Sequence, residues 1–561
     1  MKHNMKSDSK NQNKNFMVQG TILAGASIIV RLIGMIYRIP LTGIIGDEGM
    51  GLYGCAFEVY NIALLLSSYS LPLAVSKLVS ARLAKGENKN AFKVFKGALL
   101  FAVTAGLIIS LVVFVFSDFI AEKIMDSHLS AYALRVLAPC LFIVAVMGVV
   151  RGFFQGHGNM VPTAVSQVIE QIVNAVVSVV AASYLFKAGV AAAEAMHLDA
   201  DSAKLYGPAY GAAGGTLGTI TGAFAGLVFL IILYILSKPV IKRKLKRDRS
   251  TEQEDYSIIF KVLFATIIPV VLSSALYNIC GILDQIIFNH TMSARGMAYS
   301  EYTRLIGMYS GKFLLLINVP LAMANALASS SIPSITASIA KKAPKRIIFD
   351  KINITMRVSM IIAVPSFVGY VVLGSPILKL LWGDDRRQMA LILAIGAISV
   401  VFYSLSTISN AVLQGLDHMK KPLKNAFISL VIHLGILYLL LLTGLNIYAV
   451  VIANSLFSLT MCILNQRDIR KVCGYRQEYR RNFFLPFIAS VIMAIIAWAF
   501  YKIIYLVAGN TVATILALII AVIVYATSLV RIKGVTEEEL LEFPKGKTIV
   551  RILRKIKVLR D

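Results

Sequence analysis

Two arginines inside an apolar segment are the residues in this sequence best suited to chemistry. Arg31 and Arg38 lie in the stretch GTILAGASIIVRLIGMIYRIPLTGIIGDEGMGLYG, residues 20–54, whose apolar part is long enough to cross a bilayer as a helix. An arginine at the centre of such a helix costs roughly 2.5–3.5 kcal/mol on insertion scales. The spacing of two helical turns puts both guanidinium groups on one face, with Gly34 between them. That face should line a polar cavity. Because guanidinium groups bind phosphate oxygens bidentately, the expected ligand is an anion such as phosphate or pyrophosphate.

Four glycines surround Asp47 and Glu48 at the end of this stretch. They are Gly43, Gly46, Gly49 and Gly51. Glycine accepts backbone conformations that other residues avoid, so the cluster predicts a sharp turn at the membrane surface.

The composition predicts an all-α polytopic membrane protein. Of the 561 residues, 57% are hydrophobic and 15% are charged, and apolar runs of spanning length recur throughout the chain. About fourteen transmembrane helices are expected, near residues 17–45, 52–79, 94–117, 131–154, 162–186, 209–236, 257–289, 304–339, 352–375, 388–413, 423–443, 446–465, 483–507 and 511–531.

Loop charge predicts the topology. Lys and Arg gather in the N-terminal segment and in alternate loops, whereas the loops between these carry acidic residues, as at Asp47, Asp118 and Glu194. By the positive-inside rule both termini are cytoplasmic. The same distribution accounts for the net charge of +27, so no nucleic-acid partner is expected. The polar N-terminal segment is interpreted as preceding a retained first helix rather than as part of a cleaved signal.

Weak internal repetition divides the chain into two lobes. FFQGHGNMVP at 153–162 resembles AVLQGLDHMKKP at 411–422, and LPLAVSK at 71–77 resembles VPLAMAN at 319–325. Two pseudo-symmetric six-helix lobes plus two C-terminal helices explain this pattern, with a central cavity between the lobes. The expected domains are a cytoplasmic tail (1–16), an N-lobe (17–236), a basic linker (237–256), a C-lobe (257–466), a cytoplasmic loop (467–482), two further spans (483–531) and a cytoplasmic amphipathic tail (532–561). This tail is expected to lie on anionic membrane lipids, with a partner-binding motif as the alternative.

A polar stripe follows one face of the fifth predicted span. Its members are Gln167, Glu170, Gln171, Asn174 and Ser178, spaced as one helical face. The stripe should face the cavity or another helix, because amide side chains also hold neighbouring helices together in membrane bundles. Glu170 either stays protonated or pairs with a cation, and Arg31 lies at a similar depth.

Other charged residues within the spans have two interpretations each. Glu58 could pair with Arg38 or form an interfacial ion pair. Lys77, like Arg151, lies near a cytoplasmic helix end, where snorkelling explains a cation as well as ligand binding does. Asp284 is expected to bind a coupling cation or to pair with Lys312.

Catalytic and metal-binding groupings are absent from the sequence pattern. There is no Ser/His/Asp set, phosphate-binding loop or paired-carboxylate motif, and the five cysteines show no C-x-x-C or His/Cys spacing typical of a metal site. A transporter rather than an enzyme is therefore expected, without a metal, disulfide or cofactor.

Three segments together resemble a known family. IIVRLIGMIYRIPLTGIIGDEGMGLY, SLPLAVSKLVS and VVRGFFQGHGNMVPTAVSQVIEQIV are similar to the polysaccharide-biosynthesis and stage V sporulation B branch of the MOP (multidrug/oligosaccharidyl-lipid/polysaccharide) exporter superfamily. That branch includes the MurJ-type lipid II flippases of Gram-positive bacteria, and the similarity covers nearly the whole chain. The resemblance implies alternating access between two lobes. The cationic set that would bind the diphosphate of a lipid-linked glycan is Arg31, Arg38, Lys77 and Lys312.

The resemblance also implies a bacterial cell-membrane location and a role in cell-wall biogenesis, with the cell-wall synthesis machinery as a partner. Asp284 would stand at the family's sodium site, with coupling to Na⁺, H⁺ or the membrane potential. Lipid II is the substrate that we expect. The alternatives are another lipid-linked oligosaccharide, for a capsule, teichoic polymer or spore envelope, and a drug/cation antiporter on the same fold. A membrane-embedded glycan polymerase would need a catalytic acid cluster near an outer loop, which the sequence does not show.

Overall fold

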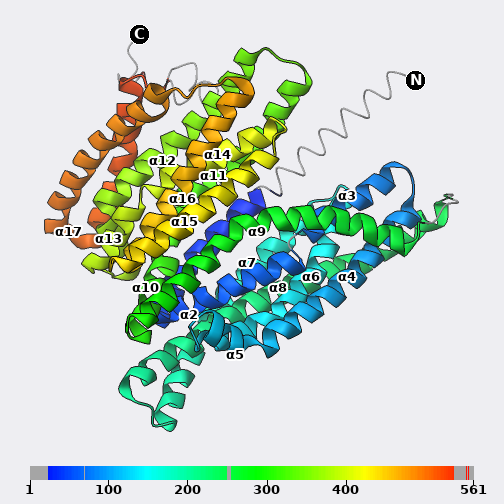
Figure 1. The fold of residues 1–561 in the computed structure, drawn as a ribbon, viewed down its shortest axis with the longest axis horizontal. Coiled ribbons are helices and arrows are strands. Elements are labelled where there is room, and N and C mark those ends of the chain that lie inside the picture. Colours follow the sequence, from blue (N-terminus) through cyan, green and yellow to red (C-terminus); the bar gives the residue numbers. More distant parts are fainter. Residues whose placement is uncertain are drawn as a thin grey trace. The chain divides into compact units, whose positions relative to one another are not determined.

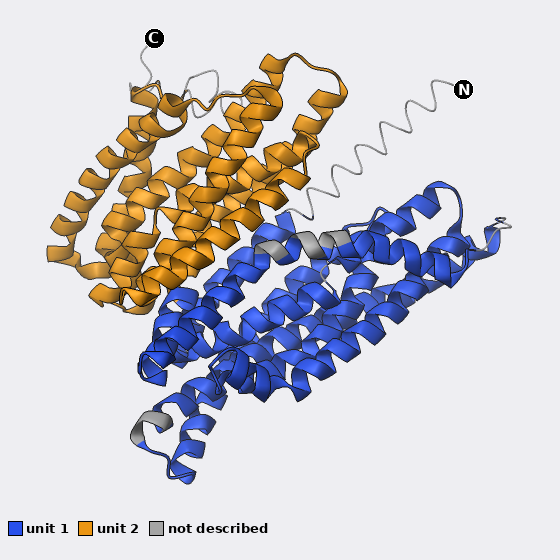
Figure 2. Cartoon of the chain, viewed as in Figure 1, with its two compact units in different colours: residues 1–311 blue, residues 312–561 orange. Residues whose placement is uncertain are grey.

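The structure, a computed structural model, describes residues 23, 25–68, 70–248, 250, 254–535, 551 and 554. The predicted N-terminal tail and most of the predicted amphipathic tail lie outside these residues. The described part is helical and contains no strand, which confirms the all-α prediction. It divides into two compact units, residues 1–311 and residues 312–561 (Figure 2).

The first helix described in unit 1 covers residues 25–36 and continues into α2, since the Tyr37 N–H donates to Ile33 O. The helices that follow are α2 (Arg38–Ser67), α3 (Leu71–Ala84), α4 (Asn88–Val115), α5 (Ser117–Phe119), the π-helix η1 (Ile120–Ile124), α6 (Ser130–Gly156), α7 (Val161–Ala195), α8 (Ala200–Arg247), α9 (Tyr256–Ala294) and α10 (Tyr299–Gly307) (Figure 1). The π-helix η2 (Met308–Phe313) contains the boundary between the units.

Unit 2 continues the same helical pattern. It comprises α11 (Leu314–Ala340), α12 (Lys345–Trp382), α13 (Arg387–Gly396), α14 (Ser399–Gly415), α15 (Lys420–Leu442), α16 (Ile447–Cys473), the π-helix η3 (Arg480–Phe484) and α17 (Leu485–Arg531) (Figure 1). Within it, α12 packs against α11, α14 and α17, and α14 packs against α16.

The number of membrane spans agrees with the prediction. Among the described residues, eleven helices are long and apolar enough to cross a membrane. Two of these contain a glycine with a left-handed φ, Gly46 (72°) in α2 and Gly509 (70°) in α17. Each of these two helices therefore consists of two helical segments. The 39-residue helix α9 is not among the eleven. Counting both segments of the two helices and adding α9 gives about fourteen spans.

At Gly46 the chain reverses direction, as the glycine cluster predicts. The hydroxyl groups of Tyr37 and Tyr53 lie 3.4 Å apart, whereas sixteen residues of straight helix would separate them by roughly 24 Å. Leu41 and Tyr53 also both lie beside Gly215 of α8. The two halves of α2 are thus the arms of a helical hairpin, and only glycine readily adopts the backbone conformation at its tip.

A seam of glycines joins α7 to α8. Gly214, Gly218, Gly222 and Gly226 recur every four residues along α8, the small-xxx-small pattern that lets membrane helices approach closely. At Gly218 an added Cβ would lie 2.6 Å from the Asn174 carbonyl oxygen. The two backbones are therefore in direct contact along this seam.

The seventh predicted span belongs to unit 1, because both of its ends are bound there. At one end Asn289 Nδ2 donates to Met125 O (2.7 Å). At the other, the segment leading into α9 is held by the α3–α4 loop, where Arg82 forms an ion pair with Glu254 at 2.8 Å and the Lys89 N–H donates to Asp248. The boundary between the units thus falls in the eighth predicted span, beyond the basic segment in which α8 ends.

Candidate functional site in unit 1

The hairpin in α2 places Arg38 against an aromatic ring. The Arg38 guanidinium carbon lies 6.0 Å from the centre of the Tyr53 ring, a cation–π distance that contributes about 0.5–1 kcal/mol at exposed sites and more when desolvated. Arg38 is half-buried, whereas Arg31, two turns earlier, is exposed. In the first predicted span, the Arg38 guanidinium group therefore packs on an aromatic ring, whereas that of Arg31 is exposed.

The polar stripe of α7 faces the interior of unit 1. Asn174 and Ser178 are buried, and the Ser178 hydroxyl donates to Gly215 O at 2.7 Å. The opposite face is apolar and exposed, as at Ile172 and Val176, which suits contact with lipid. The glycine seam and the Ser178 hydrogen bond explain why this helix buries polar side chains toward α8.

Glu170 pairs with Arg151 of α6. Arg151 Nη2 donates to Glu170 Oε2 at 2.8 Å, and Arg151 Nε donates to Ser166 Oγ at 3.0 Å. The two charged side chains retain 12% and 22% of their exposure. The sequence had suggested Arg31 as the cation at a matching depth. The structure instead supplies Arg151, whose position near a helix end fits either snorkelling or ligand binding in the sequence.

Gln167 and Gln171 form the remaining part of the stripe. The side-chain oxygen of each is buried and accepts no hydrogen bond from the part of the chain that the structure describes. The Gln171 oxygen faces the first span, because it lies 3.6 Å from the position that a Cβ on Gly34 would take. Two unused acceptors thus belong to the same unit as Arg31 and Arg38.

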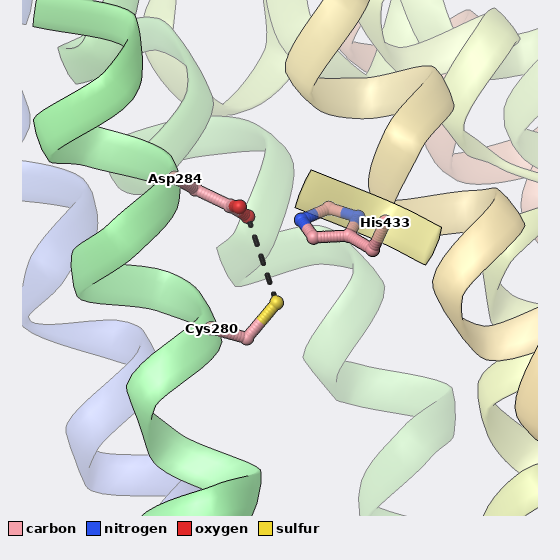
Figure 3. Close-up of side chains that lie close together, drawn as sticks. All are labelled: Cys280, Asp284 and His433. Atoms are coloured by element: carbon pink, nitrogen blue, oxygen red, sulfur yellow. Dashed lines mark hydrogen bonds between the residues drawn. The ribbon is translucent and has the colours of Figure 1, made fainter. Parts of the chain in front are cut away.

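Glu58, in the second arm of the α2 hairpin, lies against α9 rather than in a salt bridge to Arg38. Its Oε2 is 2.8 Å from the Cβ position of Gly281. On the same helix Cys280 Sγ lies 4.0 Å from Asp284 Oδ2 (Figure 3), and both Cys280 and Asp284 are buried. Two carboxyl groups and a thiol therefore gather where α2 meets α9.

The remaining predicted cations are Lys77 and Lys312. Lys77 of α3 is exposed. Lys312, in unit 2, is buried and donates to Asp384 at 2.6 Å, and Arg386 binds the same carboxylate. Burial alone would raise the pKa of Asp384, but the hydrogen bonds from Arg386 and Lys312 outweigh it and lower the pKa below its ordinary value. Lys312 thus forms a buried ion pair with Asp384, a partner that the sequence did not indicate.

The described part of the chain is a bundle of long apolar helices with polar groups buried inside it, the architecture of a multi-pass membrane protein. The model of the polysaccharide biosynthesis protein family matches residues 17–338, more than half of the chain. The chain belongs to this family.

Individual relatives agree with this assignment. The chain is 27% identical to the lipid II flippase MurJ of Bacillus subtilis over 499 residues, which cover 85% of this chain and 87% of the relative. It is 24% identical to stage V sporulation protein B of Bacillus subtilis over 430 residues, which cover 76% and 78%. A solved inward closed structure of the lipid II flippase MurJ matches with a TM-score of 0.63 at 14% identity, covering 91% of this chain and 98% of that one. This last match concerns the fold alone.

Proposed function

We propose that this protein is a flippase that moves a lipid-linked glycan, most specifically lipid II, from the inner to the outer leaflet by alternating access. One arrangement in unit 1 carries the proposal. Arg31 and Arg38 share the first span, Arg38 lies against Tyr53 in the second arm of the α2 hairpin, and the polar stripe of α7 approaches this span at Gly34. Two guanidinium groups on one face of a membrane-spanning helix suit a diphosphate. The family and the names of the relatives support the same class of substrate.

In this proposal Arg31 and Arg38 bind the diphosphate. Lys77 adds positive charge to the exposed surface of unit 1. Lys312 contributes less, because Asp384 already offsets its charge. The proposal places both termini in the cytoplasm, so that inner-leaflet substrate meets the basic side of the protein.

The membrane potential supplies a driving force in this proposal. Moving one negative charge outward across an inside-negative membrane gains about 2.3 kcal/mol per 100 mV. A bound diphosphate therefore moves outward favourably, and the empty cationic site is drawn back toward the cytoplasm. Asp284 is the proposed residue for coupling to Na⁺ or H⁺.

The test is depletion of this protein in a strain that lacks other flippases, followed by complementation. We expect lipid II to accumulate on the inner leaflet and Arg31→Ala to fail to relieve the accumulation although the variant is present in the membrane. Arg31→Lys should restore part of the function, because it keeps the charge and loses the bidentate contact. Lys187→Ala, which removes an exposed cation of α7, is the matched control and should complement fully.

A second substrate is favoured by one observation. The chain is nearly as similar to stage V sporulation protein B as to the lipid II flippase, which leaves another lipid-linked oligosaccharide as the alternative. If lipid II is distributed normally after depletion, the lipid II assignment is wrong and this alternative replaces it. Turnover of labelled lipid II by the purified protein in detergent would instead indicate a polymerase.

A further inference from the structure

Two side-chain oxygens in the fifth span stand apart from the rest of their stripe. Gln167 and Gln171 are four residues apart on α7, so their side chains lie one turn apart on one face. Each has a buried oxygen that receives no hydrogen bond from the described residues. Buried acceptors are normally satisfied, and leaving one unsatisfied destabilises the fold. These two oxygens therefore need an explanation.

Helix packing does not supply that explanation. The other members of the stripe have partners: Glu170 pairs with Arg151, and the Ser178 hydroxyl binds both Asn174 Oδ1 and Gly215 O. The glycine seam on α8 already holds α7 in place. Gln167 and Gln171 are thus the members of the stripe whose oxygens contribute no hydrogen bond to packing among the described residues of unit 1.

The position of Gln171 links these oxygens to the two arginines. Its oxygen lies 3.6 Å from the Cβ position of Gly34. Gly34 is three residues after Arg31 and four residues before Arg38, and residues at these spacings share one face of a helix. The face that carries the guanidinium groups is therefore the face that the Gln171 oxygen approaches.

The chemistry of the acceptors restricts what they can bind. An amide oxygen accepts hydrogen bonds and donates none. An ionised diphosphate offers only acceptors, and an isoprenoid tail offers no polar group. The part of a lipid-linked glycan that carries donors is the sugar, with its hydroxyl and amide N–H groups.

We propose that Gln167 and Gln171 bind the sugar next to the diphosphate, accepting hydrogen bonds from its hydroxyl or amide N–H groups while Arg31 and Arg38 hold the phosphates. The proposal rests on the proposed function and assigns the two parts of the lipid headgroup to different side chains. The arginines recognise any lipid diphosphate, whereas the two amides distinguish a glycan-bearing lipid from a bare one.

The test compares two ligands on the full-length protein in nanodiscs: lipid II and undecaprenyl diphosphate, which has the same diphosphate and tail but no sugar. Losing one net hydrogen bond weakens binding roughly fivefold. Gln167→Leu with Gln171→Leu should therefore weaken lipid II binding about ten- to thirtyfold and leave undecaprenyl diphosphate binding unchanged. Arg31→Ala should weaken binding of both ligands. Gln388→Leu, which removes an amide from the first turn of α13, should change neither.

The melting temperature of the ligand-free protein gives a second readout. Replacing an unsatisfied buried amide by an apolar side chain of similar size removes a desolvation cost, so the double variant should melt at a higher temperature than the wild type. If the two amides instead hold helices together, the same variant will melt at a lower temperature, and the proposal is wrong.

The remaining outcomes separate this proposal from the proposed function. Equal loss of both ligands in the double variant would assign the amides to the phosphates and overturn the proposal. Unchanged binding of lipid II would overturn it as well. If the wild-type protein binds neither ligand, the proposed function fails first, and the sugar-binding proposal fails with it.

Discussion

Gly218→Ala tests whether the seam between α7 and α8 is as close as the structure shows. An added Cβ would lie 2.6 Å from both the Asn174 carbonyl oxygen and the Ser178 backbone nitrogen, whereas ordinary contact begins at 3.4 Å. Backbone atoms cannot rotate away, so the two helices must separate by about 0.8 Å, the difference between these distances. A gap of that size forfeits about a quarter to a half of the dispersion attraction along the seam.

The expected cost of this variant is about 2–4 kcal/mol. Overpacking accounts for about 1–3 kcal/mol, and weakening of the hydrogen bond from Ser178 to Gly215 O, 2.7 Å long, adds about 1 kcal/mol. The assay is the apparent melting temperature of the purified protein in detergent, which should fall by several degrees. Adding Ser178→Ala should restore little, because it relieves the contact with the hydroxyl and leaves the backbone contacts.

The matched control is Gly435→Ala in α15, where an added Cβ meets nothing within 4 Å. Alanine is favoured over glycine inside a helix by about 0.5–1 kcal/mol, so this variant should melt at or slightly above the wild-type temperature. If Gly218→Ala and Gly435→Ala have the same melting temperature, the backbones of α7 and α8 are not in contact and the close seam is refuted.

Two further predictions concern charges in unit 1. Glu170→Gln leaves Arg151 without its counter-charge and should cost roughly 2 kcal/mol, less than the 3–5 kcal/mol of a fully buried pair; Glu170→Leu with Arg151→Met should melt above either single variant, and equal melting of all three would contradict the pairing. Hydrogen bonds from the Lys89 and Ser250 N–H groups lower the pKa of Asp248 from 3.8 to about 2. The stabilisation of the fold by the ionised Asp248 carboxylate is therefore complete above about pH 4 and is lost as the pH falls through 2. Hydrogen exchange at the Lys89 amide should follow this profile and should be fast at neutral pH in Asp248→Ala; continued protection in that variant would exclude the contact.

The sequence was sufficient for the fold class because hydropathy and glycine act locally. Apolar runs determine which segments span, and the glycine cluster around Asp47 predicted the reversal. The sequence did not indicate which glycine forms the tip, because several of them tolerate a left-handed φ. The structure assigns that position to Gly46.

The partners of buried charges could not be read from the sequence. Their similar depth in the membrane suggested Arg31 as the partner of Glu170. The ion pair instead forms with Arg151, because tertiary packing places α6 beside α7. Lys312 likewise pairs with Asp384, 72 residues away. The glycine seam, in contrast, has a sequence signal: the four-residue repeat from Gly214 to Gly226 is visible in the printed chain and could have identified the partner face of α7.

The seam also has a consequence for how the protein is made. Until α8 covers it, the face of α7 that carries Asn174 and Ser178 has only lipid as its surroundings, and polar side chains are costly there. The fifth and sixth spans should therefore leave the insertion machinery as a pair, with α7 retained until α8 has been synthesised. A substitution that widens the seam would then act during biosynthesis and would lower the amount of protein in the membrane before any substrate is met.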